Sequence, residues 1–127
     1  MINPIQLLTN FNKAYSLPVN RKPTLISTEE SNLKFKLLLE ELEEYKVACD
    51  NEDLVEVCDA IIDMTYVIYG IVVQHGLTEV FEDMFEEVHN SNMSKLENGK
   101  VLRRSDGKIL KGSEYFKPNI KKFIGST

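Results

Sequence analysis

The sequence has few of the residues that would place it outside the ordinary helix-rich globular proteins. Cysteine occurs twice, at Cys49 and Cys58, which is too few for a disulfide framework and lacks zinc-site spacing. The 4 prolines and 6 glycines exclude a collagen-like or low-complexity chain. The apolar runs are too short for a membrane span, and no basic segment followed by an apolar block begins the chain. We therefore expect a folded cytoplasmic protein with reduced thiols and no membrane partner.

Basic residues are missing from the middle of the chain, where no Lys or Arg lies between Lys46 and Lys95. Residues 1–94 carry 6 basic and 17 acidic side chains, whereas residues 95–127 carry 9 basic and 3 acidic ones. An acidic body with a basic tail suits an anion that is bound through a metal, because the acids hold the metal and the tail contacts the anion. Alternatively, the tail only neutralises the body. A nucleic-acid partner is not expected for a body this acidic.

Apolar spacing and capping residues predict an all-α fold of four helices in a single domain of 127 residues. The expected helices cover residues 4–15, 28–48, 52–74 and 79–89, with Asn3, Ser27 and Thr78 as caps of the first, second and fourth. Asp106-Gly107, between Lys100 and Lys111, predicts a small β-hairpin. The core helices thus span about 28–89, and a basic hairpin and tail span about 96–127.

Asp63 is the only formal charge between Ala60 and Val73, in the most apolar stretch of the chain. An isolated buried carboxylate is too costly, so Asp63 must be paired, metal-bound or protonated. No cation is available nearby in the sequence. Acids do recur on the same face of this helix, at spacings of four, three and four residues: Glu52, Glu56, Asp59 and Asp63.

A second set of acids lies on the preceding helix, where Glu41 falls within the apolar stripe and Glu44 borders it, with Glu40 beside them. Two acidic helix faces that share an interior need a cation between them. Carboxylates without His or Cys select Mg²⁺ or Mn²⁺ over zinc. The alternative is that this Glu-rich segment is ordinary solvated surface. The stripe itself consists of Leu37, Leu38, Glu41, Tyr45 and Ala48.

These segments resemble the all-α nucleoside triphosphate pyrophosphohydrolases, a superfamily that includes MazG, the dimeric dUTPases and phosphoribosyl-ATP pyrophosphohydrolase. Residues 37–45, Leu-Leu-Leu-Glu-Glu-Leu-Glu-Glu-Tyr, are similar to its Glu-Glu-x-x-Glu helix, and residues 59–70 to the second metal helix of its MazG-like branch. Residues 85–95 and 106–112, followed by Tyr115 and Pro118, are similar to segments of phage and bacterial members. The resemblance covers about residues 27–119.

The chain departs from the superfamily on the second metal helix, where the pattern is often Glu-x-x-Asp. If Asp63 is that Asp, the Glu position is occupied by Ala60, and Asp59 must substitute for it. Alternatively, Glu56 and Asp59 form the motif literally, which leaves Asp63 unexplained in the apolar run. We prefer Asp59 and Asp63.

The resemblance implies a Mg²⁺-dependent hydrolase, with Mn²⁺ as a possible replacement. In this family, one to three Mg²⁺ ions lie between the two helices, and water attacks the α/β-phosphate junction of a nucleotide to give the monophosphate and pyrophosphate. Glu40 is then the expected catalytic base, with Glu41 as the alternative. The implied metal ligands are Glu41, Glu44, Asp59 and Asp63.

The resemblance also implies a substrate-binding set and an oligomer. Asn92 and Lys95 would contact phosphate or sugar, and Lys108, Lys111 and Tyr115 of the tail complete the expected set. Members of the family are homodimers or homotetramers, and the apolar third helix also favours contact with another subunit.

Two rival functions fit the same sequence. The first is a non-catalytic helical oligomer that uses its acidic face to bind a protein. The second is a degenerate family member that binds nucleotides without cleaving them, with Ala60 as the lost ligand. A carboxylate in an apolar run has a use in a metal site but none in a protein-binding surface, so Asp63 favours the enzyme.

Overall fold

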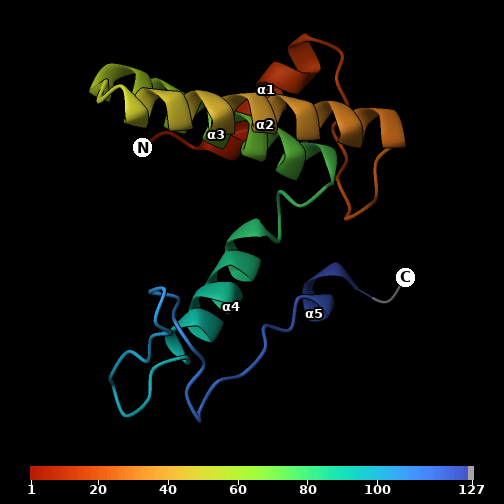
Figure 1. Cartoon of the computed structure of the whole chain (residues 1–127). Helices are drawn as coiled ribbons and strands as arrows, with labels where there is room; N and C mark the ends of the chain where they lie inside the picture. The colour runs from red at the N-terminus through yellow and green to blue at the C-terminus, as the bar shows by residue number, and fades with distance from the viewer. Residues whose placement is uncertain (126–127) are drawn as a thin grey trace. The chain divides into compact units, whose positions relative to one another are not determined.

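The computed structural model describes residues 1–125, and the chain divides into two compact units, the first from Met1 to Glu79 and the second from Val80 onward. The first unit contains α1 (Pro4–Ala14), α2 (Thr28–Asp50) and α3 (Leu54–Gln74). The second contains α4 (Phe81–Met93) and the short α5 (Lys121–Ile124) (Figure 1). Residues 1–125 contain no β-strand, so the all-α class is confirmed. Packing of α4 into a four-helix bundle, and a single domain, stay predictions.

The first three helices begin at polar caps, of which the sequence predicted the first two. Asn3, Ser27 and Asp53 each accept a hydrogen bond from the backbone N–H three residues further on, at 3.3, 3.1 and 3.2 Å. These bonds satisfy N–H groups that have no partner within the helix. The predicted ends of α1, α2 and α3 agree with the structure to within two residues. Asp53, expected inside the third helix, is instead its cap.

α3 is the central helix of the first unit, because α1 and α2 both pack against it. Two small residues, Ala48 of α2 and Ala60 of α3, are buried where the helical hairpin closes. Further along α3, the Phe11 ring of α1 meets the Tyr66 ring edge-on, with 5.5 Å between centroids. Buried apolar side chains come from all three helices: Ile5, Leu8, Ala48, Ala60, Val72 and Val73. No helix in residues 1–125 has the length and apolar character needed to cross a membrane.

The loop between α1 and α2 is hydrogen-bonded to the C-terminal end of α3. Asn20 donates its side-chain amide to the carbonyl of Gln74 at 2.6 Å. The Thr24 N–H donates to the carbonyl of His75 at 2.9 Å, and the His75 ring contacts the Thr24 carbonyl in return at 2.7 Å. These bonds satisfy carbonyls that the end of a helix leaves free, and they fix α1 and α2 relative to α3.

α4 differs from its predicted bounds at both ends. It begins at Phe81 and not at Glu79, so Thr78 is not its cap, and Val80 at the cap position makes no side-chain hydrogen bond. The helix begins with the acids Glu82 and Asp83, which favour an N-terminus through the helix dipole. It continues past the predicted end to Met93 because Ser91 is buried and bonded to a later segment of the chain.

Residues 112–122, here called the strap, run along α4 and are held to it by polar contacts. The Ser91 hydroxyl donates to the carbonyl of Phe116 at 2.8 Å, and the N–H of Phe116 donates to the Ser94 hydroxyl at 3.1 Å. Nearer the C-terminal end of the strap, Asn119 and Lys122 bind Glu87 of α4. The Glu87 carboxylate accepts hydrogen bonds from the N–H of Asn119 at 2.8 Å and from the ammonium of Lys122 at 3.0 Å. These bonds lower the pKa of Glu87.

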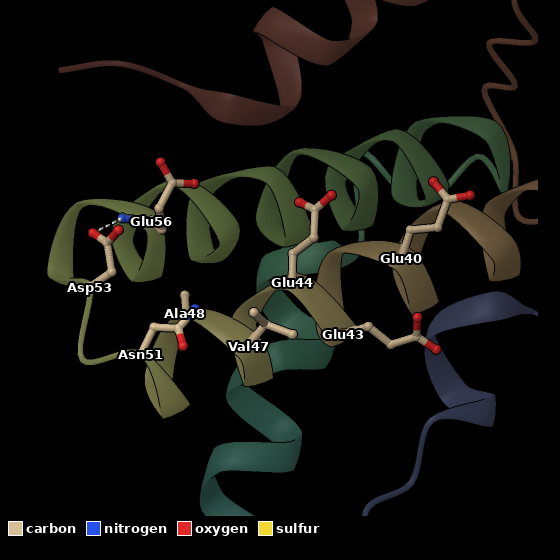
Figure 2. A pocket seen from close by; sticks show the side chains of 8 residues that line it. All are labelled: Glu40, Glu43, Glu44, Val47, Ala48, Asn51, Asp53 and Glu56. Carbon is tan, nitrogen blue, oxygen red and sulfur yellow. Dashed lines mark hydrogen bonds between the residues drawn. The ribbon is translucent and has the colours of Figure 1, made fainter.

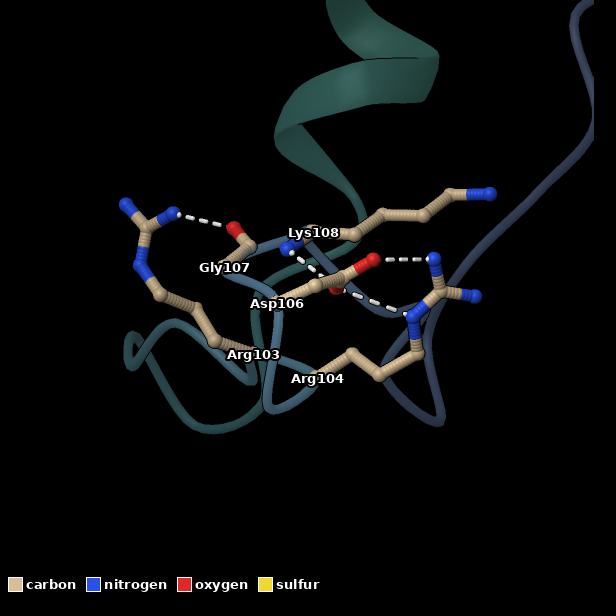
Figure 3. A network of polar contacts seen from close by, with 5 residues as sticks. All are labelled: Arg103, Arg104, Asp106, Gly107 and Lys108. Atoms are coloured by element: carbon tan, nitrogen blue, oxygen red, sulfur yellow. Dashed lines mark hydrogen bonds and ion pairs between the residues drawn. The ribbon is translucent and has the colours of Figure 1, made fainter.

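The predicted β-hairpin is not confirmed as a pair of strands. The chain does reverse at Asp106-Gly107, where Arg104 donates its N–H to the Lys108 carbonyl at 2.8 Å and its guanidinium pairs with Asp106 (Figure 3). One isolated antiparallel bridge joins Arg103 to Ile109. Residues 101–110 are all exposed, so neither side of the turn has a packed face on which strands could form.

Gly76→Ala is expected to destabilise the protein by about 3 kcal/mol. Gly76 has φ +71°, and an added Cβ would lie 2.0 Å from the carbonyl oxygen of Lys22, so the backbone of the loop would have to move. Gly99→Ala is the matched control, because Gly99 has φ +75° and open space around its Cβ position. Urea unfolding measures both free energies. Equal losses in the two variants would contradict a specific role for the close approach at Gly76.

Candidate metal and nucleotide site

Four of the predicted site residues meet where α2 packs on α3. Glu41 and Glu44 come from α2, and Asp59 and Asp63 from α3, and we call these four the carboxylate cluster. Glu44 and Asp59 lie close enough to Glu41 and Asp63 to raise the pKa of both, and Asp63 also raises the pKa of Glu41. Glu41 and Asp63 are partly buried, whereas Glu44 and Asp59 are exposed. The helical hairpin therefore places two half-buried acids facing each other, with one more exposed acid beside each.

Glu41 is the acid most affected by this environment. Burial raises its pKa to about 7, and the neighbouring carboxylates of Glu44, Asp63 and Asp59 act in the same direction. Its Oε2 atom is buried and receives no hydrogen bond from the residues that the structure describes. A buried oxygen without a donor is costly unless a proton or a cation satisfies it.

Asp63, on the opposite helix, is the second acid of the cluster whose pKa is raised. Burial and the charges of Asp59 and Glu44 raise its pKa, as does a hydrogen bond with Asp59, while a hydrogen bond with Glu41 opposes the shift. In residues 1–125 no Lys or Arg forms an ion pair with it. Within the described residues Asp63 thus has no cationic partner, and its role as a metal ligand stays a prediction.

The cluster fits a hard divalent cation by its chemistry. All of its donors are carboxylate oxygens, which is the ligand set of Mg²⁺ and Mn²⁺, and the free Oε2 of Glu41 supplies a lone pair that no protein group uses. Across residues 1–125, however, no three His, Cys, Asp or Glu side chains stand close enough to hold an ion as they are. Four like charges repel, so a cation would have to draw the carboxylates together.

A cavity of about 550 Å³ adjoins the cluster in the first unit, and Glu44 belongs to both. Figure 2 shows Glu40 and Glu44 projecting from the same side of α2, whereas Glu43, which also lines the cavity, projects from another side. Glu56 lines the cavity from the start of α3 and does not contribute to the pKa of Glu41 or Asp63. The cavity is strongly acidic, with Glu40, Glu43, Glu44, Val47, Ala48, Asn51, Asp53 and Glu56 as its lining.

Sequence reasoning missed one cation at the helix interface. Lys34 lies on the α2 stripe seven residues before Glu41, and its ammonium would lie 3.6 Å from a Cβ on Gly70 of α3. Burial lowers its pKa and the charge of Glu30 opposes that shift. The spacing of residues along α3 carries no signal for a lysine that α2 supplies. Lys34 makes no contribution to the pKa of Asp63.

The predicted substrate-binding residues all lie in the second unit. Asn92 is exposed at the end of α4, and Lys95 follows two residues after that end. The Lys111 ammonium stands over the Tyr115 ring, 4.8 Å from its centroid. Lys108 belongs to the turn, where its N–H donates to Asp106 while its ammonium extends away from the network of Figure 3. Lys108 and Lys111 therefore carry exposed positive charge, whereas Lys95 is partly buried.

Three further residues of this unit have a structural role, and two of them, Glu97 and Ser113, lie outside the segments that resemble the family. Glu97, Gly112 and Ser113 join the segment after α4 to the start of the strap. Glycine beside serine is common in loops, and Glu97 lies 16 residues from its partner. The only available indication was that Glu97 is one of 3 acids in the basic tail.

Glu41→Gln is expected to flatten the pH dependence of stability in the metal-free protein. With a folded pKa of about 7 against an ordinary value of 4.5, folded Glu41 binds a proton that the unfolded chain releases, so stability falls as the pH rises from about 4.5 through 7. The amide of the substituted glutamine carries no charge, so the variant loses this fall. Thermal unfolding in EDTA at pH 5 and pH 8 measures it, and an unchanged difference between the two temperatures would contradict the prediction.

Comparison with known proteins identifies the family to which this chain belongs. The family model described as phosphoribosyl-ATP pyrophosphohydrolase matches residues 8–92, about two thirds of the chain, and includes the whole carboxylate cluster. No curated protein matches the chain. Enzymes of this kind depend on a divalent metal. The chain belongs to the phosphoribosyl-ATP pyrophosphohydrolase family and is a nucleotide pyrophosphohydrolase, a hydrolase that acts on phosphoric anhydride bonds.

Proposed function

We propose that the protein hydrolyses a nucleoside triphosphate, or a related nucleotide, at the α/β-phosphate junction and that Mg²⁺ is its metal. The products are a nucleoside monophosphate and pyrophosphate. The carboxylate cluster carries this proposal, because Glu41 and Asp63 are half-buried acids that face each other without an ion pair to any described residue. This repulsion lowers the stability of the fold, and a bound divalent metal would offset it.

The four acids of the cluster are the proposed metal ligands. A bound Mg²⁺ lowers the pKa of water and offsets the charge of the phosphates. Glu41 and Asp63 would be its partly buried ligands, and Glu44 and Asp59 its solvent-exposed ones. Asp59 therefore serves where the family often has Glu, and Ala60, buried against the helix interface, has no ligand role.

Glu40 is the proposed base that orients or deprotonates the attacking water. It is exposed, lines the cavity beside Glu44 and lies one residue from Glu41, so water can reach it next to the ligands. A base must lie within hydrogen-bond reach of the water that it activates. Glu41, whose pKa of about 7 also suits a base, remains the alternative.

Basic and aromatic residues of the second unit are the proposed contacts to the substrate. Phosphate groups are anionic, and the ammonium group of lysine binds them as a point charge. Lys95, Lys108 and Lys111 form no ion pair in residues 1–125 and are available for this contact. Asn92 contributes an amide for sugar or phosphate, and Tyr115 offers a face for a base.

The enzyme is also proposed to be a homodimer or homotetramer. The exposed aliphatic residues of α3 follow a seven-residue spacing, which is the repeat by which helices pack along one another. Val55 and Ile62, at 75% and 64% exposure, form one row, and the next row consists of Leu54, Ile61 and Ile68. Such a surface would be unusual on a monomer, and a second copy of the same helix could cover it.

Asp63→Asn is expected to lower the rate of pyrophosphate release at least about a hundredfold, because a neutral amide binds Mg²⁺ poorly and leaves the metal misplaced. Release would be followed over a panel of NTPs and dNTPs, with Mg²⁺ and with EDTA. Asp50→Asn is the control, since exposed Asp50 pairs only with Lys46, at 2.6 Å.

The panel also identifies the substrate and decides between the rival functions. Release that requires Mg²⁺ and survives in Asp50→Asn but not in Asp63→Asn supports the enzyme and its ligand. If no nucleotide is cleaved while the wild-type protein is folded, the proposed reaction is wrong. Nucleotide binding without cleavage would then indicate a degenerate member.

Ile62→Lys is expected to weaken self-association by at least about tenfold without unfolding the subunit, because a charge enters the apolar row while the buried core is untouched. Sedimentation velocity over a range of concentrations measures the change. Leu25→Lys is the control, as Leu25 is 89% exposed in the loop before α2. Equal effects of the two variants, or a wild-type monomer, would contradict the proposed interface.

A further inference from the structure

In the second unit, Glu97 is hydrogen-bonded to Ser113, a residue distant from it in the sequence. Its carboxylate accepts two hydrogen bonds from Ser113, one from the backbone N–H and one from the hydroxyl at 3.0 Å. These two bonds lower the pKa of Glu97. Beside them, the N–H of Gly112 donates to the carbonyl of Lys95 at 2.8 Å. The start of the strap is thus fastened to the segment that follows α4.

The contact is so close that only glycine fits at position 112. A Cβ there would lie 2.7 Å from the carbonyl oxygen of Leu96, and 2.8 Å from both Glu97 Oε2 and the carbonyl oxygen of Lys95. Two of these three atoms belong to the backbone, which cannot rotate aside as a side chain can. We call Glu97, Gly112 and Ser113 the clip.

The clip lies between two of the proposed phosphate-binding lysines. Lys95 precedes one side of it, and Lys111 precedes the other, so closing the clip sets the backbone of both. The N–H of Tyr115 donates to the carbonyl of Gly112 at 3.3 Å, and the Tyr115 ring lies beneath the Lys111 ammonium. The clip therefore holds both lysines and the aromatic face in one arrangement.

Glu97 forms no ion pair with these lysines. Both of its carboxylate oxygens are bonded to Ser113, and in residues 1–125 neither Lys95 nor Lys111 forms an ion pair. An acid in this basic segment would otherwise compete with an anionic ligand for the ammonium groups. Here it organises the segment while their charge remains available.

We propose that Glu97, with Gly112 and Ser113, is a positioning residue that holds Lys95 and Lys111 together for the phosphate groups of the substrate. This inference rests on the proposed function, in which those lysines bind phosphate. Glu97 touches neither the substrate nor the metal, and it acts through the backbone of the two lysines. Its loss therefore weakens the binding of substrate and transition state alike, which raises KM and leaves kcat nearly unchanged.

The test compares three variants of the clip, Glu97→Ala, Ser113→Ala and Gly112→Ala, with the control Glu114→Ala. Glu114 is an exposed acid of the same segment, and it makes no hydrogen bond or ion pair in residues 1–125. Steady-state pyrophosphate release gives kcat and KM. Calorimetric titration with inorganic pyrophosphate and Mg²⁺ gives binding without turnover. Amide hydrogen exchange at Gly112 and Ser113 reports whether the clip is closed.

We expect the three clip variants to lose exchange protection at these amides, to raise KM about tenfold and to weaken pyrophosphate binding to a similar extent, with kcat within about twofold of wild type. Glu114→Ala should match wild type in all measurements. Lost protection with unchanged KM and unchanged pyrophosphate binding would overturn the inference and make the clip purely structural. If wild type binds pyrophosphate but cleaves no nucleotide, the proposed function fails and the titration alone decides on the clip. If wild type does neither, both are wrong.

Discussion

Repulsion among the four acids of the carboxylate cluster is the constraint on which the structure of the first unit depends. The helical hairpin brings Glu41 and Asp63 together in partial burial, and nothing in the described chain neutralises them. Folding must therefore be supported by the rest of the unit. The capped helix starts, the packing of α1 and α2 on α3 and the polar contacts of the α1–α2 loop supply that support. An unfavourable charge arrangement of this kind is characteristic of a site that is completed by a ligand.

Much of the first unit could be predicted from the sequence because its determinants are local. Asn3 and Ser27 act within one turn of their helices, so the pattern of residues was enough to place α1 and α2. Glu41 and Asp63 stood out because each interrupts an apolar stripe of known period. Their meeting across two helices required only that the stripes pack together, which is what amphipathic helices do.

The rest depended on contacts that periodicity does not encode. Lys34 was missed because its partner face belongs to another helix, and the clip because Glu97 and Ser113 are distant in sequence. Threonine often caps a helix, but α4 begins beyond Thr78, at Phe81, beside the acids Glu82 and Asp83 that favour a helix N-terminus. Asp106-Gly107 does reverse the chain, yet strands need a packed face that residues 101–110 lack.

The short connection between α2 and α3 has a consequence for how the protein is made. All four acids of the cluster lie within residues 41–63, on two helices joined through Asn51 and the Asp53 cap. Contacts between residues so near in sequence cost little chain entropy and form early in folding. The newly made chain can therefore assemble its acids before the strap has been synthesised, and a divalent ion encountered at that moment could stabilise the hairpin while the remainder folds onto it.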